Sequence, residues 1–237
     1  MRILITSGGT TVPIDPVRSI RNVSTGSFGT ALAAAALKAG MDVTYLAARN
    51  AKSPFSETID FYQSDNWQAN VDGLEKLYQF SETYRTNYIE HRYHGFAEYA
   101  ELLQKLIQTE QPTVIMLAAA VSDYLVANYS DDKIRSGSSL PIELKAAPKV
   151  IHSVRQWSKN SFVVGFKLLV NVTDEELVQA ALSIIKQHQL DLVVANTLSS
   201  IKRNAHEVLL VEPNGHYKKV SQNIADTVIM DIVKRCA

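Results

Sequence analysis

The chain begins with a β-type run, a long glycine-containing segment, an alanine-rich run and a second β-type run, and this order restricts the possible folds strongly. Residues 2–6 (RILIT) predict a strand, residues 27–39 predict a helix that stops at Gly40, and residues 42–46 (DVTYL) predict a second strand. Strand–helix–strand units with right-handed crossovers place their two strands parallel in one sheet. The expected fold class is therefore α/β.

Further apolar runs extend this unit into a Rossmann-like, mainly parallel central sheet with helices on both faces. Residues 113–121 (TVIMLAAAV) and 162–169 (FVVGFKLL) have the continuous apolar pattern of strands that are covered on two sides. Helical spacing of apolar residues, or a Thr before an acidic first turn, predicts the helices. They are expected within residues 67–78, 96–107, 148–157, 173–188 and 221–234.

The end of the chain predicts a smaller β-hairpin region. Residues 192–195 predict one more strand, and residues 208–211 and 217–220 flank the turn Pro213-Asn214-Gly215. We expect this hairpin to be able to pair subunits. No internal repeat or linker-like stretch divides the sequence, so residues 1–237 are expected to form one domain.

Two polar stretches interrupt the regular pattern. Residues 81–95 are polar and rich in Tyr, which predicts an exposed connection. Residues 128–140 lack periodicity and predict a long loop, and long loops in compact domains are usually functional. We expect residues 131–140 to form a mobile lid that closes over a bound nucleotide and excludes water.

Charge and cysteine content limit the partners. The chain has 24 Lys plus Arg against 24 Asp plus Glu, so it lacks the net charge that gathers nucleic acid or anionic membranes. Its single cysteine, Cys236, excludes an intrachain disulfide and a cysteine-based metal cluster. No signal peptide or membrane-spanning run is recognisable. We expect a cytoplasmic protein.

Residues 7–29 (SGGTTVPIDPVRSIRNVSTGSFG) lie between the first strand and the first helix, where an anion is commonly bound. Glycines allow close approach of the backbone, Ser and Thr supply hydroxyl groups, and the helix N-terminus supplies N–H groups. An irregular loop with ordinary turn glycines is the alternative. The segment contains neither GxGxxG nor GxxxxGK[ST], so the common dinucleotide and P-loop motifs are absent.

Several short motifs in this segment and beyond it resemble phosphopantothenate-cysteine ligases. The resemblance rests on Gly8-Gly9-Thr10, Ile14-Asp15-Pro16-Val17-Arg18, Asn22 and Ser24-Thr25-Gly26, and it continues through Ala118 to Tyr124, Asp132 to Arg135, Val164-Gly165-Phe166 and Val194 to Thr197. The motifs occur in the family's order and cover nearly the whole chain.

The resemblance implies a monofunctional ligase of coenzyme A biosynthesis. Such an enzyme condenses 4'-phosphopantothenate with cysteine through an acyl-nucleotide intermediate, an acyl-cytidylate if the nucleotide is CTP. CTP is favoured over ATP, and Mg²⁺ is expected on the triphosphate. The resemblance also implies a homodimer and a separate decarboxylase that acts downstream.

The resemblance assigns roles to individual residues. Catalytic roles fall on Asn22, Lys133 and Arg18, nucleotide binding on Gly8, Gly9, Ser24, Gly26, Asp123, Lys145 and Phe166, and substrate binding on Asn22, Ala119, Ala120 and Asn196. An ion pair between Arg18 and Asp15 is the structural alternative for Arg18. Ser27 and Phe28 stand where the family often has a Lys, so one anion contact is expected to be missing.

Two other function classes and a histidine pair make further predictions that the sequence can be compared with. An NAD(P)-dependent Rossmann-type oxidoreductase predicts a GxGxxG motif, which is absent, and a non-catalytic nucleotide-binding protein predicts loss of Asn22 and Lys133, which are present. His91 and His94 could begin a metal site, but no third ligand lies nearby, so no protein metal site is expected.

Overall fold

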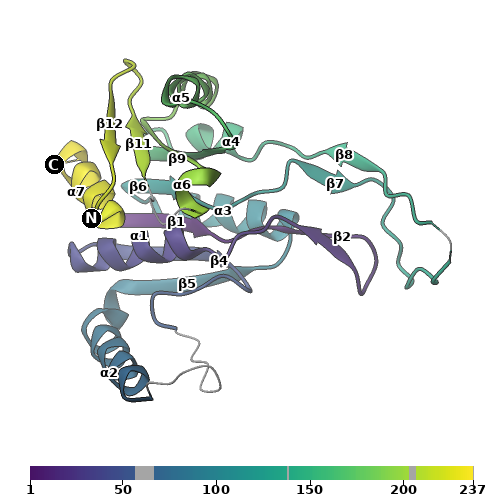
Figure 1. The fold of residues 1–237 in the computed structure, drawn as a ribbon, viewed down its shortest axis with the longest axis horizontal. Helices are drawn as coiled ribbons and strands as arrows, with labels where there is room; N and C mark the ends of the chain where they lie inside the picture. The colour runs from purple at the N-terminus through teal and green to yellow at the C-terminus, as the bar shows by residue number, and fades with distance from the viewer. Residues whose placement is uncertain (57–66, 138, 203–206, 237) are drawn as a thin grey trace.

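The computed structural model describes residues 1–56, 67–137, 139–202 and 207–236, and these contain an eight-stranded central sheet (Figure 1). The strand order is β12–β11–β10–β9–β6–β1–β4–β5. The strands are β1 (Arg2–Ser7), β4 (Asp42–Ala48), β5 (Tyr88–Tyr93), β6 (Val114–Leu117), β9 (Phe162–Leu169), β10 (Leu192–Thr197), β11 (Val208–Val211) and β12 (Tyr217–Val220). Strands β10 to β5 are parallel, whereas β11 and β12 pair antiparallel, as the hairpin turn predicted.

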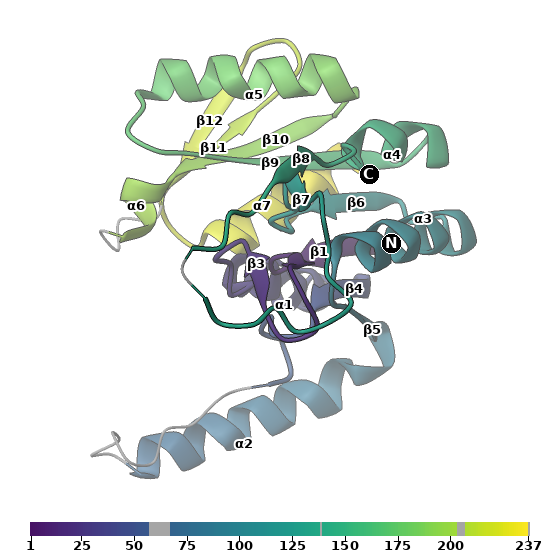
Figure 2. The same cartoon turned by 90° about the vertical axis from the view of Figure 1, so that its right-hand side faces the viewer.

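Helices cover both faces of the sheet (Figures 1 and 2). On one face α1 (Ser27–Lys38) packs against β1, β4 and α7 (Ile224–Cys236), and on the other α4 (Ile151–Trp157) lies between α3 (Phe96–Glu110) and α5 (Asp174–His188). Short helix α6 (Leu198–Lys202) follows β10. The predicted Rossmann-like, mainly parallel α/β fold is thus confirmed.

The first strand–helix–strand unit has the predicted parallel pairing. Arg2 pairs with Asp42 and Ser7 with Ala47, which makes β1 and β4 neighbours throughout their length. Both strands are buried apart from their first residues, because helices cover them on each side. Their carboxyl ends, and those of β6, β9 and β10, meet at one edge of the sheet.

The prediction of an exposed connection at residues 81–95 is wrong. Helix α2 (Trp67–Tyr84) continues into a short 3-10 helix, η1 (Arg85–Asn87), and then into β5, which pairs in parallel with β4. The polar side chains of β5 do not mark a loop, because Glu90 and Arg92 find partners on neighbouring segments. Tyr93 is fully buried.

The apolar run at residues 113–121 is a strand only over β6, and its last residues bend away from the sheet. Ala120 forms a bridge with Gly9 instead of continuing the ladder to β9. The alanines after β6 therefore belong to the loop at the carboxyl edge of the sheet.

An arm extends from this edge (Figure 1). We use the name for residues 11–21 and the described part of 124–146. It contains two small antiparallel hairpins, β2 (Thr11–Pro13) with β3 (Ser19–Arg21) and β7 (Tyr124–Val126) with β8 (Leu144–Ala146). The described part of the predicted long loop, 128–140, has no helix or strand and connects β7 to β8.

Within the described residues, the helices are all too short or too polar to cross a bilayer.

Candidate nucleotide and substrate site

The loop after β1 is joined to the loop after β6 by a set of hydrogen bonds around Ala120. The Ala120 N–H donates to the Gly8 carbonyl at 2.7 Å, and the Ala120 carbonyl accepts from the Thr10 N–H at 3.2 Å and from Asn22 Nδ2 at 3.1 Å. Gly9 and Ala120 also form the bridge between the two loops. Four of the residues predicted from the resemblance, Gly8, Gly9, Asn22 and Ala120, therefore lie together.

The glycines of the first loop are required by close packing. Gly8 and Gly26 have φ values of 81° and 73°, which favour glycine. A Cβ at Gly8 would lie 2.7 Å from the Cβ atoms of both Ala48 and Ala51, and one at Gly26 would lie 2.8 Å from Ala51 Cβ. Gly26 is the N-cap residue of α1, so the loop enters the helix through a turn that has no side chain at the N-cap position.

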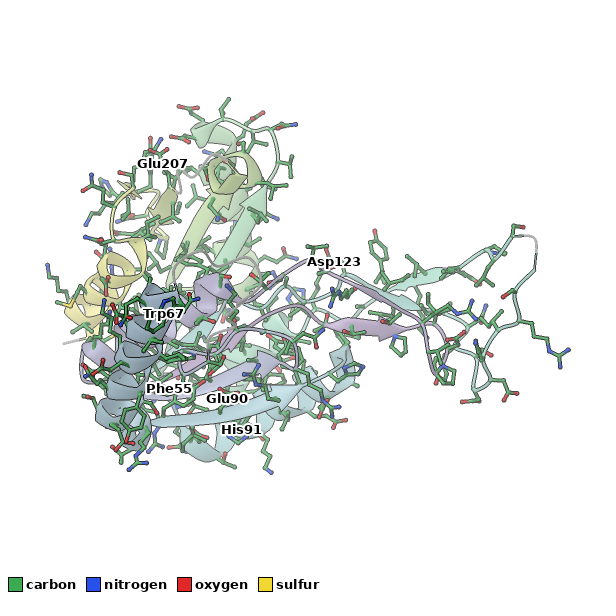
Figure 3. The ribbon with its side chains drawn as sticks, turned by 60° about the horizontal axis from the view of Figure 1, so that its bottom comes forward. Phe55, Trp67, Glu90, His91, Asp123 and Glu207 are labelled. Carbon is green, nitrogen blue, oxygen red and sulfur yellow. The ribbon has the colours of Figure 1, made fainter. Side chains whose placement is uncertain are left out.

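Two cavities meet at Ser122 and Asp123, where the arm leaves the sheet. One, of about 200 Å³, is lined by Ala119, Asp123 and Phe166 among others. The second, of about 190 Å³, is lined by Asn22, Tyr124 and residues of the arm. Figure 3 shows Asp123 at the base of the arm. The cavities place the predicted residues Ala119, Asn22, Asp123 and Phe166 around one region.

Phe166 contacts Phe28, and Phe28 lines a third hollow. Its ring packs edge-on against Phe28, with centroids 5.8 Å apart. Phe28 and Ser27 line a hollow of about 460 Å³ whose other wall is the start of α7, including Asn223 and Asp226. Phe166 therefore lines the cavity at Asp123 and packs against a residue that lines the hollow beside the start of α1.

Arg18 takes part in the ion pair that was the structural alternative for it. Its guanidinium lies 2.7 Å from the buried Asp15 carboxylate and also donates to the Ile134 carbonyl. Asp15 accepts from the Ile134 N–H at 3.2 Å. The pair thus holds both backbone groups of the residue that follows Lys133.

Burial by itself would raise the pKa of Asp15, but hydrogen bonds from the backbone of Val17, Ile134 and Arg18 outweigh it. The pKa of this carboxyl is therefore held below its usual range, and Asp15 stays charged near neutral pH. Lys133 is exposed beside this turn of the arm, whereas Asn22 lies against Ala120. We call the loop around Gly8, Gly9 and Gly26 the glycine-rich loop. Lys133 lies instead on the arm, next to the residue that Asp15 and Arg18 hold.

The other predicted residues lie at separate places. Lys145 is exposed on β8 of the arm and pairs with Leu125, and Ser24 is half-buried before α1. Asn196 is at the carboxyl end of β10, but it lines a small hollow of about 30 Å³ with Asp174 and Lys219. Asn196 therefore lies at the same edge of the sheet as the cavities at Asp123. The hollow that it lines has no lining residue in common with those cavities.

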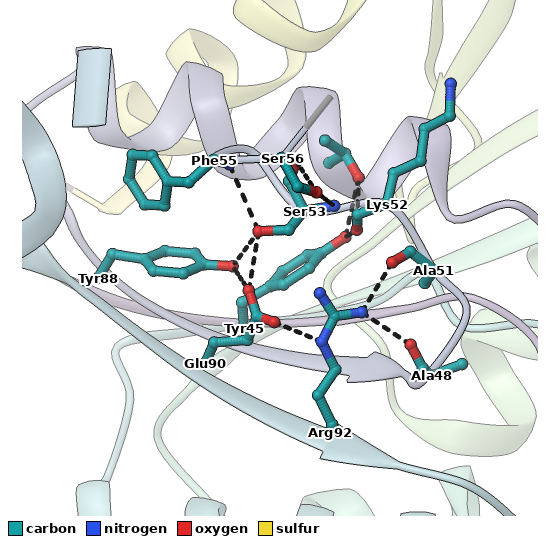
Figure 4. A network of polar contacts seen from close by, with 11 residues as sticks. Tyr45, Ala48, Ala51, Lys52, Ser53, Phe55, Ser56, Tyr88, Glu90 and Arg92 are labelled. Atoms are coloured by element: carbon teal, nitrogen blue, oxygen red, sulfur yellow. Dashed lines mark hydrogen bonds and ion pairs between the residues drawn. The ribbon is translucent and has the colours of Figure 1, made fainter. Parts of the chain in front are cut away.

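Sequence reasoning missed Lys149 and a polar network behind the glycine-rich loop. Lys149 Nζ lies 2.5 Å from Asp123 Oδ1 and lines the same cavity. Glu90 and Arg92 of β5 form an ion pair, and Arg92 binds backbone carbonyls of the turn after β4 (Figure 4). Tyr88, Ile89 and Tyr93 are residues that favour strands, and they are the signal that could have identified this strand.

In the part of the chain that the structure describes, no three His, Cys, Asp or Glu side chains gather in a way that could hold a metal ion. His91 and His94 fall within this part of the chain.

A family model and several known proteins match the chain. The model is described as the DNA/pantothenate metabolism flavoprotein C-terminal domain and matches residues 1–72 and 96–237. A solved structure of the DNA/pantothenate metabolism flavoprotein from Streptococcus pneumoniae has a TM-score of 0.79, with 28% identity over 99% of both chains.

Two relatives differ in how much of their length is matched. The Coenzyme A biosynthesis bifunctional protein CoaBC of Thermococcus kodakarensis is 34% identical over 89% of this chain and 44% of its own length. The phosphopantothenate–cysteine ligase of Homo sapiens is 31% identical over 84% of this chain and 72% of its own. The chain spans about half the length of the bifunctional relatives it matches. On these matches the chain belongs to the phosphopantothenate-cysteine ligase family and carries its DNA/pantothenate metabolism flavoprotein C-terminal domain.

Proposed function

We propose that the protein condenses 4'-phosphopantothenate with cysteine in coenzyme A biosynthesis. In the first step the substrate carboxylate attacks the α-phosphate of a nucleoside triphosphate, an O–P bond forms and pyrophosphate leaves. In the second step the cysteine amine attacks the acyl carbon, the nucleoside monophosphate leaves and the amine loses a proton. The observation that carries the proposal is the joining of the glycine-rich loop to Ala120 and Asn22.

The residues around this junction suit anionic substrates. Gly8, Gly9 and Gly26 pack without side chains against Ala48, Ala51 and Asn22. This close packing brings the loop to the start of α1, where backbone N–H groups can bind phosphate oxygens. Asn22 already donates to Ala120, and its amide oxygen remains able to accept from the attacking amine. Asp123 and Phe166 border the cavity proposed for the nucleotide, and Ala119 leaves room there.

Lys133 is proposed to neutralise charge that develops on the transferred α-phosphate. Its place on the arm means that the loop must move, or that a second copy must supply it. The second case requires the proposed homodimer, which light scattering would test. Mg²⁺ would bind through the triphosphate, since magnesium sites commonly use substrate phosphates.

The finer assignments follow from the sequence. We favour CTP over ATP as the nucleotide, a cytoplasmic location and a separate decarboxylase downstream. An NAD(P)-dependent oxidoreductase has no supporting feature, because the turn after β1 lacks GxGxxG. A non-catalytic nucleotide-binding protein is distinguished by assay.

The test is pyrophosphate release with CTP or ATP, in the presence and absence of phosphopantothenate and cysteine. Lys133→Gln is expected to lower release by roughly 10² to 10³, the scale for one preorganised donor. Lys105→Gln, on an exposed position of α3, is the matched control and should release pyrophosphate at the parent rate. No release by the parent with either nucleotide would reject the ligase proposal, and an unchanged rate in Lys133→Gln would reject the role of Lys133.

A further inference from the structure

The outer strand of the sheet, β5, carries a polar network beside the turn that follows β4. Tyr88, Glu90 and Arg92 alternate along the strand and so point to one face. Glu90 accepts from the Ser53 hydroxyl at 2.8 Å and from the Tyr88 hydroxyl at 2.5 Å, and it also pairs with the Arg92 guanidinium. Glu90 thereby fixes the direction in which Arg92 reaches (Figure 4).

Arg92 closes the turn after β4 by binding two of its carbonyls. Its Nη1 donates to the Ala48 carbonyl at 2.9 Å and to the Ala51 carbonyl at 2.7 Å. The Ala51 N–H in turn donates to the Ala48 carbonyl at 2.9 Å. Hydrogen bonds from a charged donor are stronger than those between neutral groups, so the Arg92 guanidinium contributes strongly to holding the turn in this conformation.

The same two alanines form the rear wall of the glycine-rich loop. Their methyl groups occupy the space where side chains at Gly8 and Gly26 would lie. The next residue extends the contact, because the Lys52 N–H donates to the Thr25 carbonyl at 3.0 Å. The Lys52 carbonyl accepts from the hydroxyls of Tyr45 and Thr30. A displaced turn would therefore leave Gly8 and Gly26 unsupported.

We propose that Arg92, oriented by Glu90, is a positioning residue for nucleotide binding. It acts through the turn of residues 48–52, which sets the shape of the glycine-rich loop. The inference rests on the proposed function, because it takes that loop to be the phosphate site. Both residues lie in 73–95, the stretch that the family model leaves unmatched, so the family description does not assign them this role.

The experiment measures the dissociation constants of CTP and ATP by calorimetry, together with Tm. Arg92→Gln removes the positive charge and the guanidinium donors that bind the two carbonyls. We expect the dissociation constant of the nucleotide to rise about tenfold, equivalent to about 1.4 kcal/mol. Arg92→Lys keeps the charge beside Glu90 and one donor for a carbonyl, so it should recover part of the affinity. KM for cysteine should stay within about twofold of the parent value.

Arg155→Gln is the matched control. Arg155 also binds backbone carbonyls, those of Gln189 and Ser161, and pairs with Asp191. These contacts lie at the amino ends of β9 and β10, whereas the glycine-rich loop lies at the carboxyl ends of the strands. It should lower Tm without changing nucleotide affinity. Should Arg92→Gln fail to fold, Ala51→Gly takes its place, because it removes the supporting methyl group while leaving the network intact.

The outcomes separate the two proposals. Parent affinity in Arg92→Gln, or in Ala51→Gly where that variant replaces it, overturns the positioning role while the ligase proposal stands. Equal loss of affinity in Arg155→Gln also overturns it, because the effect is then one of general stability. A parent protein that binds neither nucleotide rejects the proposed function, and the positioning role with it.

Discussion

Two glycines make the same backbone turn under different constraints. Gly26 and Gly40 have φ values of 73° and 75°, but a Cβ at Gly40 would meet nothing within 4 Å, whereas one at Gly26 would meet Ala51 and Ser7 Oγ at 2.8 Å. Alanine at Gly40 pays only for the left-handed backbone, roughly 1 to 2 kcal/mol. Alanine at Gly26 adds overpacking of about 1 to 3 kcal/mol.

We therefore predict that Gly26→Ala lowers the free energy of unfolding more than Gly40→Ala does, and that it alone weakens nucleotide binding. Urea unfolding and calorimetry measure the two quantities. Equal losses of stability in both variants would contradict the prediction, because Ala51 and Ser7 would then move aside without lowering the free energy of unfolding.

At the scale of elements, α4 and α5 meet through two histidines. His152 Nδ1 and His188 Nδ1 are 3.1 Å apart, and His188 is buried. Burial, and then electrostatic repulsion from His152 and Lys149, lower the pKa of His188 from its ordinary value of 6.5. In the folded protein His188 therefore takes up a proton only at a lower pH than it does in the unfolded chain.

The sign of the pH dependence follows from this. The stabilisation by neutral His188 is complete above pH 6.5 and is lost as the pH falls from 6.5 toward the lower pKa of the folded state, with a slope of up to about 1.4 kcal/mol per pH unit. Urea unfolding at pH 7.5 and 5.5 measures the loss, and His188→Gln should reduce it. The exposed His216 provides the control variant His216→Gln, which should keep the parent dependence. The prediction fails if both variants keep it.

At the scale of the whole molecule, the arm combines one anchored position with a stretch that we predict to be a lid. The Ile134 N–H donates to Asp15, so its exchange should be slow even without ligands. The other amides of the predicted lid, residues 131–140, of which 138 lies outside the described residues, should gain protection when nucleotide and phosphopantothenate bind. Amide hydrogen exchange at single-residue resolution checks both parts. Equal protection across residues 131–140 with and without these ligands would exclude the lid.

Local patterns predicted the interior of the fold well, and they predicted its outer strand poorly. The apolar runs of β1 and β4 are buried on both faces, as are Val163, Val164 and Gly165 of β9, so their composition alone indicates their state. The apolar run around β6 overestimated the strand, because Ala120 bonds to Gly8 instead of to β9. Strand β5 was missed since the partners of its polar side chains come from distant residues.

The parallel α/β core, the glycine-rich loop and the resemblance to the ligase family could be predicted from the sequence, because each depends on residues close together in the chain. The tertiary fold determines which of the candidate residues meet. It placed Asn22 on Ala120, paired Arg18 with Asp15, kept Asn196 in a separate hollow and set Arg92 behind Gly8 and Gly26. These contacts join residues far apart in sequence, and their energies depend on distance and burial, which no local pattern records.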